Sequence, residues 1–158
     1  MLLYNCTRSN ALPVSAQDFL TISGNATRSY CILELDCEGA GTASAYTEMG
    51  VFRTTTVGVT PTNTTAGNAG FPTPVNPAQP AAGFTTAFVW TTQPVLPATP
   101  FHTMPVNSNG QRYFWRAMPN LSNALWSPGG GLVAAASVSF RPITISGNIT
   151  LRAQVGEI

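Results

Sequence analysis

The stretch Tyr30-Cys31-Ile32-Leu33-Glu34-Leu35-Asp36-Cys37-Glu38 decides the fold class of this chain. Every second side chain from Cys31 to Cys37 is apolar, and the alternate positions are largely acidic. A period of two is typical of a β-strand with one buried and one exposed face. We therefore predict a strand over 30–38, with an inner face of Cys31, Leu33, Leu35 and Cys37 and an outer face of Tyr30, Ile32, Glu34, Asp36 and Glu38.

The same alternation recurs along the chain, and no long helical pattern interrupts it. Residues 16–20 fit either one helical turn or a first strand. The run Asn107-Ser108-Asn109-Gly110 predicts a hairpin turn, because Asn-Gly tolerates positive φ. About eight short strands separated by turns predict an all-β fold, an antiparallel β-sandwich or jelly roll. Besides 30–38, the expected strands cover residues 43–56, 84–92, 101–106, 111–118, 132–141 and 149–155.

A Pro- and Gly-rich segment, 57–83, interrupts the strand pattern with five prolines, four glycines and no charge. Proline lacks the N–H that a central strand donates, so this segment is not a central strand. Loops of this length inside a compact domain are usually functional or disordered. We predict one domain, 1–158, in which 57–83 is an extended docking loop. Its candidate contact residues are Phe71, Pro72, Pro74, Val75 and Pro77.

The charge content excludes several classes of function. Only 8% of the 158 residues are charged and the net charge is +1, whereas charged residues make up about 25% of an average domain. The seven basic residues, all Arg, are scattered, so we expect no nucleic-acid partner. The longest apolar run, 131–140, is half the roughly 20 residues that span a bilayer. Because Met1–Arg8 lacks a signal-peptide pattern, we expect a soluble protein made in the cytoplasm, without a membrane partner.

A block of 58 residues between Arg53 and Arg112 contains no Asp, Glu, Lys or Arg. Interface cores are depleted in charge and enriched in aromatic side chains. One interpretation is that another chain covers much of this block. The alternative is a compositional preference for Thr, Asn and Ala, which stay soluble through hydroxyl and amide groups.

The three cysteines, Cys6, Cys31 and Cys37, do not form a closed disulfide set, because their number is odd. Residues six apart on one strand are about 20 Å apart, whereas a disulfide needs Cα atoms within about 7 Å. We expect all three to act as small buried apolar groups. A bridge from Cys6 to one of the other two stays open.

The residues available for catalysis are few. His102 is the only histidine and has no nucleophile motif beside it, and the cysteine spacing does not fit a zinc site. Carboxylates spaced like Glu34, Asp36 and Glu38 serve glycosidases or bind calcium. More commonly such a face is solvated or pairs with arginine. We therefore predict no enzyme activity, no cofactor and no metal.

An arginine and aromatic cluster lies near residue 115. Arg112 and Arg116 flank Phe114 and Trp115, and Trp126 follows ten residues after Arg116. This composition is typical of interface hot spots, and it also fits cation–π packing at the edge of a core. Our second set of candidate interaction residues is Arg112, Trp115, Arg116 and Trp126.

Two runs of this sequence resemble small structural proteins of tailed bacteriophages. Thr73-Pro74-Val75-Asn76-Pro77-Ala78-Gln79-Pro80-Ala81-Ala82-Gly83-Phe84 is similar to a segment of these proteins, and Ile32–Gly39 looks like their second strand running into a Gly turn. The resemblance implies a capsid decoration (cement) protein, a β-sandwich subunit that often trimerises on the outside of the head. It further implies the virion as location, the major capsid protein and a homotrimer as partners, and no catalytic residues.

Two other functions stay open. A small icosahedral coat protein would also be a jelly roll, but it normally carries a basic arm, and residues 1–20 contain one Arg, Arg8. A receptor- or glycan-binding head of a phage tail fibre is favoured if a tryptophan lies exposed beside carboxylates. The candidates for that role are Trp90, Trp115 and Trp126.

Overall fold

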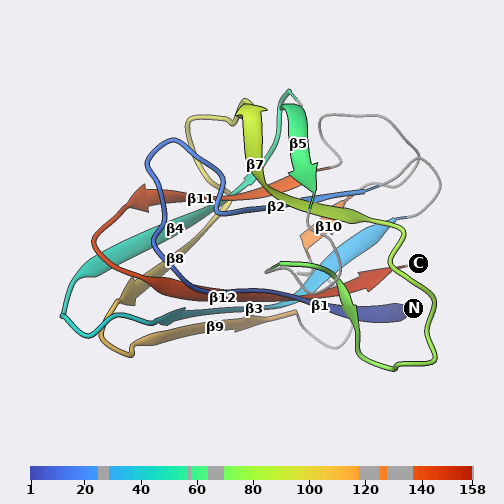
Figure 1. Cartoon of the computed structure of the whole chain (residues 1–158), viewed down its shortest axis with the longest axis horizontal. Coiled ribbons are helices and arrows are strands. Elements are labelled where there is room, and N and C mark those ends of the chain that lie inside the picture. Colours follow the sequence, from blue (N-terminus) through green and yellow to red (C-terminus); the bar gives the residue numbers. More distant parts are fainter. Residues whose placement is uncertain (25–28, 57, 64–69, 118–124, 128–136, 158) are drawn as a thin grey trace.

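The computed structural model describes residues 1–24, 29–56, 58–63, 70–117, 125–127 and 137–157. Within these ranges the chain forms strands and no helix, which confirms the all-β prediction. The strands form two antiparallel sheets that face each other as a sandwich (Figure 1).

The first sheet, sheet A, contains both terminal strands. Its order is β10-β3-β12-β1-β6, and β9 pairs with the same edge of β3 as β10. Leu2 pairs with Glu157, so the N- and C-termini lie together at one end of the sheet (Figure 1). The bounds are β1 (Leu2–Ala11), β3 (Tyr30–Gly39), β6 (Thr73–Pro74), β9 (Arg112–Arg116), β10 (Leu125–Ser127) and β12 (Ile149–Glu157).

The second sheet, sheet B, has the order β5-β7-β2-β11-β4-β8. Neighbouring strands in the sheet are antiparallel. Its strands are β2 (Leu20–Ser23), β4 (Tyr46–Arg53), β5 (Val59–Asn63), β7 (Thr85–Thr92), β8 (His102–Asn107) and β11 (Ser137–Thr144). The predicted strand over 132–141 corresponds to β11, and its residues 132–136 lie outside the described ranges. So does Met118, the last residue of the strand predicted over 111–118.

Eight of the strands have the order of a jelly roll. Four central strands of sheet A, β1-β12-β3-β9, face four of sheet B, β2-β11-β4-β8. Along the chain these strands alternate between the sheets, except at the step from β4 to β8. Such a pair of four-stranded sheets is the jelly-roll arrangement. The remaining short strands extend its edges, and β5 and β7 are inserted between β4 and β8.

The core lies between the two sheets. Alternate side chains of each strand point inward, as a period of two requires. Sheet A contributes Tyr4, Cys6, Tyr30, Ile32, Leu35, Cys37, Ile149, Leu151, Ala153 and Val155; sheet B and its connections contribute Phe19, Leu20, Ile22, Met49, Val51, Phe84, Met104, Val106, Val138 and Phe140.

The predicted inner face of 30–38 is right for its second half and wrong for its first. Ile32 pairs with Val155 and Glu34 with Gln154, which leaves Leu33 as an extra residue. A bulge of one residue exchanges the two faces of a strand. Leu35 and Cys37 therefore face the core as predicted, whereas Tyr30 and Ile32 replace Cys31 and Leu33 there.

The turn at Asn107–Gly110 connects two sheets and does not close a hairpin. β8 lies at the edge of sheet B, and β9 belongs to sheet A. Gly110 has a φ of +77°, the left-handed conformation that glycine adopts at little cost. The positive-φ turn is therefore present, but the strands on either side of it pair with β4 and β3.

The Pro-rich segment docks in extended form on its own chain. Pro74 of β6 pairs with Tyr4 of β1, and the N–H of Val75 donates to the carbonyl of Leu3 at 2.9 Å. The hydroxyl of Tyr4 donates to the carbonyl of Pro80 at 3.0 Å. Both β5 and β6 lie at sheet edges, where proline is tolerated because its missing N–H faces away from the ladder.

Residues 16–20 form neither a helical turn nor a complete strand. A turn covers residues 15–17, and strand β2 begins at Leu20. Asp18 and Phe19 between them are buried. Phe19 N–H donates to the carbonyl of Phe140 at 2.7 Å, which fixes this segment against sheet B.

Candidate functional site on the outer face of sheet A

The outer face of sheet A gathers six of the thirteen charged residues of the chain. Cross-strand pairing places each residue opposite a partner: Glu34 opposite Arg116, Glu38 opposite Arg112, and Asp36 opposite Arg152. Opposite charges directly across a pair of strands stabilise a sheet. The alternation of β3, β9 and β12 thus builds one charged face from three separate parts of the chain.

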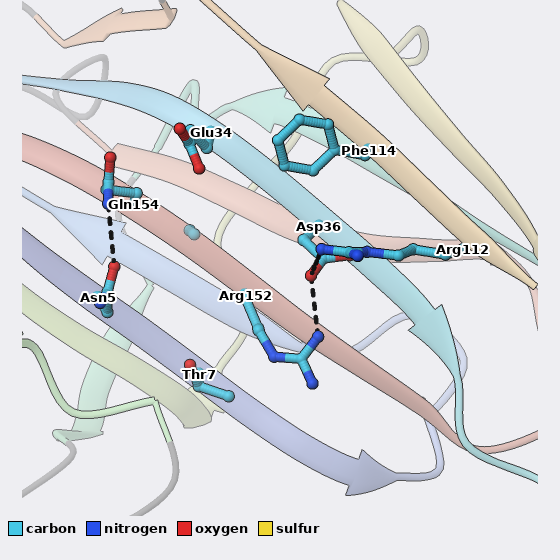
Figure 2. A pocket seen from close by; sticks show the side chains of 9 residues that line it. Asn5, Thr7, Glu34, Asp36, Arg112, Phe114, Arg152 and Gln154 are labelled. Carbon is cyan, nitrogen blue, oxygen red and sulfur yellow. Dashed lines mark hydrogen bonds and ion pairs between the residues drawn. The ribbon is translucent and has the colours of Figure 1, made fainter. Parts of the chain in front are cut away.

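Asp36 is the centre of this face. Arg112 donates to it through both Nε and Nη2, at 2.7 and 2.9 Å, and Nη1 of Arg152 donates at 2.9 Å (Figure 2). Burial alone would raise the pKa of Asp36, but the hydrogen bonds and positive charges of the two arginines outweigh it and lower that pKa. Asp36 is therefore a permanently ionised carboxylate at neutral pH.

Two further ion pairs complete the network. Nη1 of Arg152 also donates to Glu38 at 3.1 Å, and Nη2 of Arg116 lies 2.6 Å from Oε1 of Glu34. Hydrogen bonding to Asp36 raises the pKa of Arg152. The acidic face predicted from the sequence thus pairs with arginine. Within the described ranges, no group of three or more His, Cys, Asp or Glu side chains is arranged to hold a metal ion.

Phe114 lies exposed in the middle of the charged face. Its side chain is 48% exposed, and the guanidinium carbons of Arg112 and Arg116 lie 5.5 and 5.7 Å from its ring centroid. These distances are within the range of cation–π contacts. The two arginines therefore gather around Phe114, and Trp115, which we grouped with them, points to the other side of β9 against the core.

A hollow of about 200 Å³ lies over strands β9, β3, β12 and β1 (Figure 2). The network residues Glu34, Asp36, Arg112 and Arg152 line it together with Phe114, Asn5, Thr7, Ala153 and Gln154. We name this the sheet A hollow. Asn5, Thr7 and Gln154 were not among the residues predicted to form a site, although each occupies a polar position in an alternating strand.

On the opposite side of the molecule, in contrast, an ion pair is covered by other residues. On the outer face of sheet B, Asp18 accepts hydrogen bonds from Nε of Arg141 at 2.7 Å and from the hydroxyls of Thr21 and Ser139, both at 2.6 Å. Residues 93–94 cover this cluster: Gln93 accepts from the N–H of Asp18, and the carbonyl of Pro94 accepts from Arg141, both at 2.9 Å. The ion pair is therefore buried inside the protein.

The uncharged block carries exposed apolar side chains instead. Among the described side chains of the block, four large apolar ones are at least 41% exposed, and none of them belongs to the sheet A hollow: Val59, Val75, Val95 and Phe101. Of the contact residues predicted in the Pro-rich segment, Val75 and Pro77 are exposed, Phe71 and Pro74 are half-buried, and Pro72 is buried. The side chain of Trp126 lies outside the described part of the structure, and its backbone pairs with Cys31.

His102 contributes to a contact between the two sheets. Nε2 of His102 lies 2.9 Å from the hydroxyl of Tyr113, which joins the edge strands β8 and β9 of the two sheets.

The cysteines are free and buried. Burial raises the pKa of Cys6 and Cys37 to about 12. Because the thiolate is the nucleophile, thiols with such pKa values are inert at neutral pH.

The comparisons with known proteins identify no relative of this chain. No protein-family model, curated protein or solved structure matches the chain. The described residues include no helix long and apolar enough to cross a membrane.

Proposed function

We propose that this chain is a capsid decoration protein, which binds the outside of a bacteriophage head and bridges neighbouring major capsid subunits. The observation that carries the proposal is the exposed apolar surface of the uncharged block, 54–111. Among the described residues of this block, four large apolar side chains are at least 41% exposed: Val59, Val75, Val95 and Phe101. Six of the thirteen charged residues, in contrast, lie on the outer face of sheet A, where they pair with one another.

An uncharged block with exposed apolar side chains suits a subunit that another chain covers in part. The core of a protein interface is depleted in charge, and each Å² of apolar surface that it removes from water contributes about 25 cal/mol. We place Val59, Val75, Val95 and Phe101 at or near the shell. Burial across the seam between two capsid subunits then opposes their separation, and many copies together stabilise the head.

The proposal includes a homotrimer in the virion, made in the host cytoplasm before assembly. Most homo-oligomers have closed cyclic symmetry, and a three-fold subunit suits the points where three capsid subunits meet. Light scattering on the purified chain tests this part. We expect three times the chain mass of 16.6 kDa, and a monomer would contradict intrinsic trimerisation.

The strand order favours a second candidate, a coat protein that builds the shell itself. The jelly roll recurs in viral capsid proteins, but also in lectins and cupins, so the fold alone does not assign a function. The two candidates differ in what the purified chain does alone. A coat protein assembles closed shells that electron microscopy detects, whereas a decoration protein stays a small oligomer until heads are added.

Add-back to heads that lack this protein tests the docking surface. Val95→Glu places a charge on the uncharged block, and we expect it to reduce the number of copies bound per head at least tenfold. Phe114→Glu is the matched control, because Phe114 is an exposed apolar side chain on the outer face of sheet A, outside the block. Equal loss of binding by both variants, or full binding by Val95→Glu, would contradict the proposed surface.

A further inference from the structure

We propose that the sheet A hollow binds a neutral saccharide through a single sugar ring. This inference goes beyond the proposed function, because the hollow lies on the charged face and contains none of the four apolar residues that we place near the shell. The site uses four strands that are distant in sequence, and all of its side chains project from strands (Figure 2). Sites built on strands hold their side chains in fixed positions.

The exposed ring of Phe114 provides the apolar part of the site. One face of a pyranose consists of C–H groups, whose partial positive charge is attracted to the negative face of an aromatic ring. Phe114 lies beside Glu34 and Asp36 at the wall of the hollow (Figure 2). The ring is 48% exposed although two guanidinium carbons lie 5.5 and 5.7 Å from its centroid. The C–H face of a sugar can therefore stack on the exposed part of the ring while hydroxyls at the edge of the sugar reach the carboxylates.

The floor of the hollow offers both donors and acceptors. Nε2 of Gln154 donates to Oδ1 of Asn5 at 3.5 Å, a long contact that leaves both amides with hydrogen-bonding capacity. Thr7 also lines the hollow and adds a hydroxyl group to it. Each sugar hydroxyl is at once a donor and an acceptor, and amide and hydroxyl side chains match it in both roles.

The ion-pair network fixes the remaining polar groups. Asp36 is held by two arginines, and Arg152 is held in turn by Asp36 and Glu38. Such groups lose little conformational freedom when a ligand binds, which favours binding. Glu34, whose side chain is 25% exposed against 9% for Asp36, is the carboxylate that accepts charge-assisted hydrogen bonds from the sugar, and such bonds are stronger than neutral ones.

The charges that line the hollow and the volume of the hollow indicate which class of saccharide it binds. Two carboxylates, Glu34 and Asp36, and two guanidiniums, Arg112 and Arg152, line the hollow, so their formal charges cancel and neither an anion nor a cation is favoured. Drug-sized ligands occupy pockets of about 300–1,000 Å³. A hollow of about 200 Å³ suits a smaller ligand, one neutral sugar ring.

Titration of the whole chain with free sugars, followed by ¹H–¹⁵N correlation spectra, tests the inference. The probes are D-glucose, D-galactose, D-mannose and N-acetyl-D-glucosamine, with sodium sulfate as an anionic probe. We expect saturable shifts with at least one sugar, confined to amides of β1, β3, β9 and β12 around the hollow. Shifts with none of the four sugars, shifts elsewhere, or stronger binding of sulfate would overturn the proposal.

Variants of the exposed ring give a second readout. Phe114→Ala should weaken the binding of the responding sugar at least tenfold, and Phe114→Trp should retain it. Tyr46→Ala is the matched control, because Tyr46 is an equally exposed aromatic side chain on sheet B. Unchanged affinity in Phe114→Ala contradicts a role for the ring. If Phe114→Ala does not fold, the shift map of the unmodified chain decides.

Discussion

Asp18 and Arg141 form an ion pair that sheet B and residues 93–94 enclose, with side chains 0% and 17% exposed. Asp18 belongs to the connection between β1 and β2, and Arg141 lies on β11, 123 residues later. The carboxylate also accepts from Thr21 and Ser139. The pair therefore joins the N-terminal connection to sheet B.

Removal of Asp18 should strongly destabilise the protein. Asp18→Ala leaves the buried guanidinium of Arg141 and two hydroxyls without their acceptor, and breaking a buried pair in this way costs about 3–5 kcal/mol. Urea unfolding measures the loss. The double variant Asp18→Ala/Arg141→Met should recover part of it, because no uncompensated charge remains. A loss below about 1 kcal/mol in the single variant would show that the pair contributes little.

Acid should weaken the ion pairs on the outer face of sheet A and so lower the stability of the fold. The pKa of Asp36 is lower in the folded protein than its ordinary value of 3.8, so its ion pairs stabilise the fold fully above that value. This stabilisation is lost as the pH falls below 3.8 and through the folded pKa. The partners of Asp36 are largely exposed, so we expect Asp36→Asn to cost only about 1 kcal/mol near neutral pH. Urea unfolding at several pH values should show the difference between variant and parent disappear in acid, and a difference independent of pH would contradict this role.

The bulge in β3 predicts unequal costs at two neighbouring leucines. Leu35 is fully buried in the core, and Leu→Ala at such sites costs about 2–5 kcal/mol. Leu33 is half-buried on the other face, so Leu33→Ala should cost about 1 kcal/mol. Chemical denaturation of the two variants compares them directly. Equal costs would restore the uninterrupted alternation that the sequence predicts.

The cysteines should react only when the protein unfolds. Burial raises the pKa of Cys6 and Cys37 to about 12 and that of Cys31 above its ordinary value, so the thiolate population near neutral pH is negligible. Mass spectrometry after maleimide treatment should find no label on the native chain and three labels in denaturant. A labelled native chain would show that one thiol is accessible.

Local pattern predicted seven strands, because alternation of apolar and polar side chains is a property of neighbouring residues. These strands are β3, β4, β7, β8, β9, β11 and β12. The acidic outer face of β3 followed from the same alternation. The bulge at Leu33 did not, because one extra residue leaves no mark in composition. The first strand, Leu2–Ala11, was not among the predicted strands, although Tyr4 and Cys6 alternate with Asn5 and Thr7.

The candidate site could not be predicted from the sequence for a different reason. Asn5 and Gln154 meet across β1 and β12 although 149 residues separate them, and strand pairing over such distances is decided by the whole topology. The same holds for the turn at Asn107–Gly110. Its residues define a positive φ, but whether the next strand returns to the same sheet depends on which edges the other strands leave open.

The proposed role in stabilising a head is tested most directly by heating particles with and without this chain and following genome release with a DNA-binding dye. We expect particles that lack the chain to release their genome at a lower temperature, and add-back of the purified protein to restore the original temperature. Identical release temperatures with and without the chain, or particles that never contain it, would contradict the decoration function.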